Sequence, residues 1–152
     1  MQQVAADLHL HSCLSPCADI TMVPGEVTTR LVARGIRVAS VTDHNACCNA
    51  YAFARAFDRA GILFVPGVEV TTMEEVHILC YFETLSILCE FARTLFRAFP
   101  RISNDPDRFG YQLVCNEHDE FVGQFPFLLS MASFFSIDDL VDLVHERHGV
   151  AI

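Results

Sequence analysis

Short apolar runs, many of them β-branched, alternate along this chain with segments of helical periodicity. A strand–helix–strand order of this kind favours an α/β fold with a largely parallel sheet, open or closed into a barrel. The sequence contains no repeat, low-complexity segment or linker, so residues 1–152 are predicted to form one domain. The expected strands are 4–11, 38–42, 62–65, 68–72, 76–82, a hairpin of 111–115 and 120–123, and 150–152, and the expected helices are 24–35, 47–60, 85–99 and 136–148.

The chain carries a formal net charge of −9, and all ten of its basic residues apart from His are Arg. An acidic surface makes binding to a nucleic-acid backbone unfavourable, because such binding needs clustered positive charge. It does not exclude a small phosphorylated substrate, since bound metal ions reverse the sign of a pocket locally.

The sequence shows no sign of secretion or of membrane insertion. No basic leader precedes the first strand, and the longest apolar run, residues 125–135, is too short to span a membrane and is interrupted by Pro126 and Ser130. The seven Cys are odd in number and irregularly spaced, which is typical of reduced thiols rather than of a disulfide framework. We therefore expect a cytoplasmic protein.

The first strand carries polar side chains in a regular pattern, Asp7-Leu-His9-Leu-His11. Side chains alternate between the faces of a strand, so His9 and His11 project the same way and can bind one ion. Asp7 lies on the same face, where it is either a ligand or a group that orients one. The alternative is a set of hydrogen-bonded polar residues near a strand end.

Three further strands carry polar groups where apolar residues are expected. Asp43-His44-Asn45 follows an apolar strand, although Asp43 or Asn45 could instead cap the next helix. Glu69 lies between two Val residues, and a buried carboxylate is costly unless it pairs with a cation or a metal. His77 is likewise polar within an apolar strand. Four such strands together favour a shared site over separate core residues.

These residues resemble the ordered motifs of the PHP (polymerase and histidinol phosphatase) superfamily. The matching motifs are Asp7-Leu-His-Leu-His-Ser, Thr42-Asp-His-Asn, and Gly67-Val-Glu-Val with His77 following. The resemblance covers essentially the whole chain from residue 5. It implies a distorted β/α barrel with up to three metal ions at the C-terminal ends of its strands.

The resemblance also implies the ligands of each ion. His9 and His11 would hold one ion, Glu69 would bridge to a second, His77 would bind that second ion, and His44 would bind a third. Imidazole and carboxylate ligands suit Zn, Mn or Fe.

One further position of the first motif has two candidates here. The family supplies an Asp or a His shortly after the His-x-His, and this chain offers Cys17 and Asp19. We favour Asp19 because it is an oxygen ligand by type, whereas Cys17 is closer in spacing. A Cys17 thiolate would favour zinc.

The predicted function is metal-dependent hydrolysis of a phosphoester, either a phosphomonoester or a nucleotide-type substrate, by a metal-activated water. One alternative is a PHP-like domain that binds metal for structure or regulation without turnover. Another is a zinc-binding interaction module built on Cys13 and Cys17, but such a module needs four ligands, and the sequence contains no Cys-x-x-Cys pair.

The resemblance further implies ligands beyond His77, on the next strand and in a later Asp-x-His. His118, His145 and His148 are predicted to lie in a polar turn and at a helix end, outside the site. We therefore expect a domain that is truncated after about its first five strands. Such a domain would hold fewer than three well-bound ions and show weak or absent hydrolysis. It would also self-associate through an open sheet edge or have that edge covered by a partner segment.

Overall fold

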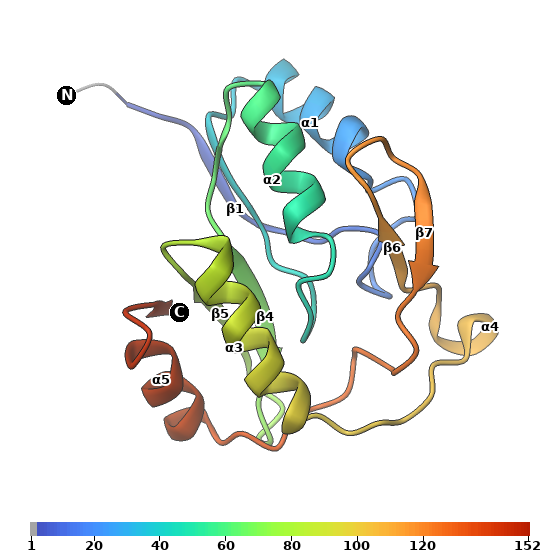
Figure 1. The fold of residues 1–152 in the computed structure, drawn as a ribbon, viewed down its shortest axis with the longest axis vertical. Helices are drawn as coiled ribbons and strands as arrows, with labels where there is room; N and C mark the ends of the chain where they lie inside the picture. Colours follow the sequence, from blue (N-terminus) through green and yellow to red (C-terminus); the bar gives the residue numbers. More distant parts are fainter. Residues whose placement is uncertain (1–2) are drawn as a thin grey trace.

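The computed structural model describes residues 3–152 as a mixed α/β fold (Figure 1). Its first sheet is parallel, in the order β1-β2-β3, and its strands are joined by two helices that pack against each other. These elements are β1 (Ala6–Leu10), α1 (Pro24–Ala33), β2 (Val38–Val41), α2 (Ala50–Arg59) and β3 (Leu63–Phe64).

The two helices cover this sheet with one apolar face each. Pro24 stands at the start of α1, where a missing backbone N–H costs nothing, and Val27 and Leu31 lie one turn apart in the core. In α2 the buried side chains include Phe53 and Phe57, whose rings pack edge to face at 5.8 Å. These helix residues pack with Ala39 and Val41 of β2 in one core.

The second sheet is antiparallel, in the order β4-β5-β8, and α3 lies over it (Figure 1). The Thr84 hydroxyl accepts the N–H of Ile87 at the start of α3, and the Ser136 hydroxyl accepts the N–H of Asp139 in α5. The elements are β4 (Gly67–Thr71), β5 (His77–Tyr81), α3 (Leu85–Arg97), α5 (Ile137–His145) and β8 (Val150–Ala151).

The prediction of a largely parallel sheet is wrong for β4, β5 and β8. Residues 72–76 are the whole connection between β4 and β5, and Glu75 turns the chain with a φ of 62°. A parallel crossover needs a dozen or more residues, so this short connection permits only an antiparallel pair.

The sheets formed by residues 3–152 do not close into a barrel, and so the barrel implied by the resemblance is not confirmed. They meet at a single parallel bridge between His44 and Glu69, with hydrogen bonds from Asn45 N–H to the Glu69 carbonyl and from Glu69 N–H to the Asp43 carbonyl. Gly67 lets β4 approach β2, because a Cβ there would lie 2.7 Å from the Ser40 hydroxyl. The junction lies among the predicted site residues.

A hairpin lies beside the two helices of the first sheet, and its Leu113 and Cys115 side chains belong to the same core as those helices (Figure 1). The Asn49 side chain ties this hairpin to the start of α2 by donating to the Leu113 carbonyl and accepting the Cys115 N–H. No helix within residues 3–152 has both the length and the apolar character needed to cross a bilayer. The remaining elements are α4 (Pro106–Phe109), β6 (Leu113–Cys115) and β7 (Phe121–Gln124).

Candidate metal centre

Four imidazoles surround one carboxylate where the two sheets meet. The Oε2 atom of Glu69 lies 3.4 Å from His9 Nε2, 3.1 Å from His11 Nε2 and 3.3 Å from His44 Nδ1. Its Oε1 atom lies 3.0 Å from His77 Nδ1. The structure therefore brings together five of the six residues predicted as ligands.

Strand geometry explains how these side chains meet. His9 and His11 are two residues apart on β1, and their Nε2 atoms lie 3.2 Å apart. On β4 and β5, Glu69 is opposite Leu79, which makes His77 its diagonal neighbour across the antiparallel pair. The parallel bridge at His44 then joins the end of β2 to Glu69.

Two buried atoms at the centre of this cluster have no hydrogen-bond partner among the described residues. They are His44 Nδ1 and Glu69 Oε2, which face each other at 3.3 Å without hydrogen-bond geometry. Leaving a buried carboxylate oxygen unsatisfied costs about 1–3 kcal/mol or more. A cation between these atoms would remove that cost, so the donor set fits a divalent metal ion.

The protonation states also suit metal binding. Burial, followed by the charge of His11, lowers the pKa of His44 to about 4, so this imidazole is neutral near pH 7. Burial opposes ionisation of Glu69, yet the nearby His11 ring and the charge of His44 lower the pKa of Glu69 to about 2. A neutral imidazole and an ionised carboxylate are the forms that bind metals.

A buried hydrogen-bond network holds His11 in place. Ser15 Oγ lies 3.0 Å from His11 Nδ1 and donates to Asp43 Oδ1 at 2.7 Å. The Asp43 carboxylate also accepts the backbone N–H and the hydroxyl of Ser12. Burial raises the pKa of Asp43, and these hydrogen bonds oppose that rise. Asp43 therefore positions the loop after β1 and, through Ser15, the ring of His11.

Replacing Asp43 with Asn is expected to lower the free energy of unfolding by about 2 kcal/mol. The Ser12 hydroxyl already accepts from Leu14 N–H and from the Asn49 amide, so it cannot also accept from a new NH₂ group. Urea denaturation of metal-free protein measures this change. Asp58→Asn, at an exposed position on α2, is the matched control and should change stability little. Equal midpoints for the two variants would show that Asp43 does not support the loop.

The structure does not bring Asp19 into the cluster. Its exposed carboxylate accepts the backbone N–H and the hydroxyl of Thr21. Cys17 instead forms a possible ligand group with His11 and His44, whose donor atoms all lie within 4.8 Å of one another. Burial raises the pKa of the Cys17 thiol, so a metal would have to displace its proton.

Two groups that orient His11 were not assigned this role from the sequence. Ser15 is an ordinary loop serine in the sequence, and its contact with His11 depends on the path of residues 12–23. Asp43 is polar at a strand end, but Asn49 rather than Asp43 stands before α2. The helix-cap role considered for Asp43 is therefore wrong.

The sequence matches the PHP domain family over residues 7–149. The chain belongs to the PHP domain family. No curated protein matches it in sequence.

Solved structures share the fold of this PHP domain at low identity. A protein assigned as a metal-dependent phosphoesterase from Bifidobacterium adolescentis is 14% identical with a TM-score of 0.62, over 99% of this chain and 66% of that one. An amidohydrolase from Chromobacterium violaceum, with bound sulfate and no metal, is 20% identical with a TM-score of 0.60, over 97% of this chain and 66% of that one. A lesion-specific endonuclease from Pyrococcus furiosus is 15% identical with a TM-score of 0.63, over 97% of this chain and 33% of that one.

The PHP domain thus spans just under two thirds of the first two proteins and a third of the endonuclease. At family level it is related to metal-dependent phosphoesterases, and its clustered His, Glu and Cys side chains form groups that could hold metal ions.

Proposed function

We propose that this PHP domain hydrolyses phosphoesters with divalent metal ions held by His9, His11, His44, Glu69 and His77. The observation that carries the proposal is the contact of four imidazoles with the two oxygens of Glu69, at 3.0–3.4 Å. A buried carboxylate is costly unless a cation compensates its charge. Four imidazoles gathered around the buried Glu69 carboxylate therefore favour a bound metal ion. The family relationship supports phosphoester hydrolysis as the chemistry.

Some of these residues would bind the ions, and others orient the residues that bind them. Ions bound in such a cluster supply a coordinated water of lowered pKa and positive charge for a phosphoryl oxygen. Glu69 has one oxygen beside His9, His11 and His44 and the other beside His77, so it would be placed to bridge two bound ions. Ser15 and Asp43 keep the His11 ring oriented, so that its Nε2 faces Glu69.

The number of donor atoms limits the number of tightly held ions. Together with Cys17, the cluster has six side chains and seven donor atoms, because Glu69 alone carries two. Three ions with three protein ligands each would need nine. We propose about two tightly bound ions per chain, chosen from Zn, Mn and Fe.

The choice between Cys17 and Asp19 can be tested by substitution. We propose Cys17 as the ligand, since its thiol lies with His11 and His44, whereas Asp19 is hydrogen-bonded to Thr21. Cys17→Ser is expected to weaken zinc binding by about tenfold or more, and Asp19→Asn to leave it unchanged, in a competition assay with a chromogenic chelator. The reverse result would return the ligand role to Asp19.

The substrate class follows from charge and from the neighbours. We propose a small phosphorylated molecule, because a net charge of −9 opposes binding along a nucleic-acid backbone. One structural neighbour, endonuclease Q, is solved with a DNA duplex carrying an abasic lesion, so duplex DNA is a direct comparison substrate.

All seven cysteines are free, in agreement with the cytoplasmic location that we propose.

Hydrolysis of a generic aryl phosphate tests the proposal. Metal-free protein should be inactive, and adding back Mn²⁺ or Zn²⁺ should restore turnover in the unmodified protein but not in His11→Ala. His118→Ala, at an exposed position far along the chain, is the control and should keep full turnover. Stable metal binding without any turnover would instead favour a structural or regulatory role for the metal.

A further inference from the structure

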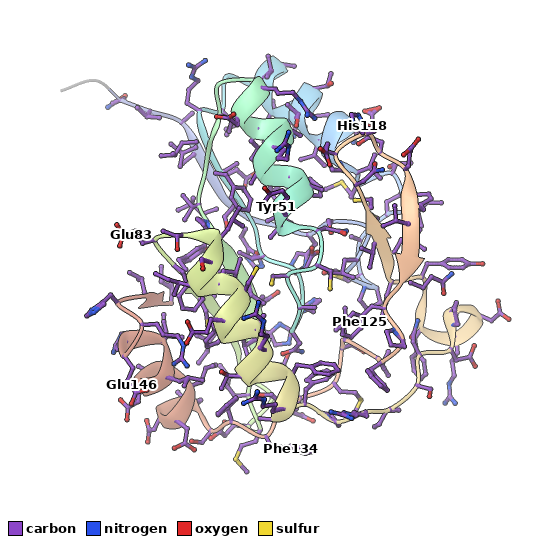
Figure 2. All side chains as sticks on the ribbon, viewed as in Figure 1. Tyr51, Glu83, His118, Phe125, Phe134 and Glu146 are labelled. Carbon is purple, nitrogen blue, oxygen red and sulfur yellow. The ribbon has the colours of Figure 1, made fainter. Side chains whose placement is uncertain are left out.

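A cavity of about 630 Å³ lies between the start of α2, the C-terminal half of α3 and the segment after β7. We call it the arginine pocket. Figure 2 shows two of its residues, Tyr51 on α2 and Phe125 just beyond β7. The aromatic and basic side chains of its lining are Tyr51, Arg93, Phe96, Arg97, Arg101 and Phe125.

The charge of the arginine pocket is opposite to that of the protein as a whole. The chain has 19 acidic residues and 10 basic ones, yet no Asp or Glu of the described residues lines this cavity. The Arg–carboxylate pairs formed within residues 3–152 all lie elsewhere, so Arg93, Arg97 and Arg101 have no carboxylate within 4.0 Å. Three exposed Arg side chains without a carboxylate partner therefore line one cavity, a pattern that favours an anion.

The backbone around the pocket favours an anion as well. Arg93 and Arg97 are four residues apart on α3, where like charges repel and gain from a shared counter-ion. On the opposite wall, the Tyr51 N–H in the first turn of α2 has no acceptor within residues 3–152. This helix start adds partial positive charge to the same cavity.

Aromatic rings form the rest of the wall. Phe96 and Phe125 pack nearly perpendicular at 6.2 Å, and the Arg101 guanidinium lies 5.3 Å over the Phe96 ring. Tyr51, which is 61% exposed, lies on the α2 side of the same cavity. These rings offer flat apolar surface beside the three guanidinium groups, which suits a ligand with a planar ring and an anionic group.

We propose that the arginine pocket binds a small aromatic phosphate of the nucleoside monophosphate class. The guanidinium groups would pair with the phosphate, and the rings would stack on the base. The volume suits one such molecule. A longer strand is disfavoured because the chain as a whole is acidic.

The pocket and the metal centre are neighbours in the chain. Asn45 lines the pocket and directly follows His44, and its N–H donates to the Glu69 carbonyl. Binding in the pocket is a separate property from hydrolysis, so it can be measured on metal-free protein. If the His and Glu cluster proves not to bind metal, the measurement of ligand binding in the arginine pocket is unaffected.

The test is calorimetric titration of metal-free protein, in the presence of a chelator, with adenosine 5′-monophosphate, adenosine and inorganic phosphate. The monophosphate should bind at one site per chain, and the other two probes at least about tenfold more weakly. Arg97→Gln and Arg93→Gln should each weaken monophosphate binding by about tenfold or more, and Phe96→Leu by about tenfold. Arg108→Gln is the matched control, because Arg108 lies 5.1 Å over the Phe109 ring outside the pocket, and it should bind normally.

Three results would overturn the proposal. The first is no saturable binding of the monophosphate to the unmodified protein. The second is equal affinity in Arg97→Gln, Arg93→Gln and the Arg108→Gln control. The third is tighter binding of a short single-stranded oligonucleotide than of the monophosphate, which would make the pocket part of a nucleic-acid surface.

Discussion

Glu69→Gln is expected to remove most of the bound metal from this PHP domain. The substitution keeps the shape of the side chain but removes the charge that faces His9, His11, His44 and His77. Loss of groups that merely orient a ligand weakens metal binding by about 10–100-fold, so loss of the bridging ligand should exceed about 100-fold. Metal per chain after dialysis against a weak chelator, by elemental analysis, measures the effect.

The matched control is Glu90→Gln, which makes the same chemical change at an exposed position on α3. It should retain as much metal as the unmodified protein. If both variants retain the same amount of metal, Glu69 is not a ligand, and the cluster is a hydrogen-bonded group without an ion.

Phe91→Ala is expected to lower the free energy of unfolding by about 3–5 kcal/mol. Phe91 is fully buried in α3, and its ring packs against Phe82 at a centroid distance of 4.8 Å. It belongs to the core between α3 and the second sheet, so its loss leaves a cavity beneath this helix. A loss of this size is a large part of the roughly 5–15 kcal/mol that stabilises a domain. Urea denaturation of metal-free protein measures it.

Phe134→Ala is the matched control, because it makes the same substitution at a residue that is 66% exposed. It should change the free energy of unfolding by less than about 1 kcal/mol. A similarly small change for Phe91→Ala would contradict the packing of α3 on β4 and β5.

The element order was predictable because local signals and tertiary contacts agree. Pro24 begins α1 and Gly35, with a φ of 70°, follows its end, as the sequence predicts. Ser136 caps α5 through Asp139 N–H, although the helix ends at His145 rather than His148. Glu69 was predictable because it is a polar group on a fully buried strand, whereas β1 is largely exposed and His9 and His11 were identified by their alternating spacing.

The strand directions and the loop after β1 were not predictable from periodicity. Alternation along β4 and β5 is the same whether the two strands run parallel or antiparallel, and only the five-residue connection decides. The placing of Cys17 and Asp19 depends on contacts distant in sequence, such as Ser12 with Asp43. Residue type favoured Asp19, whereas the path of the loop places Cys17 near His11 and His44. Self-association through an open sheet edge stays a prediction.

Locating the ions shows whether this cluster is a metal centre. An anomalous-difference map from crystals of the unmodified protein grown with Zn²⁺ or Mn²⁺ measures where the metal lies. We expect peaks about 2.0–2.2 Å from a Glu69 oxygen, with His9, His11, His44 or His77 nitrogens as the other ligands. An ordered site in which Glu69 contacts only the imidazoles, with metal peaks elsewhere or none at all, would contradict this expectation.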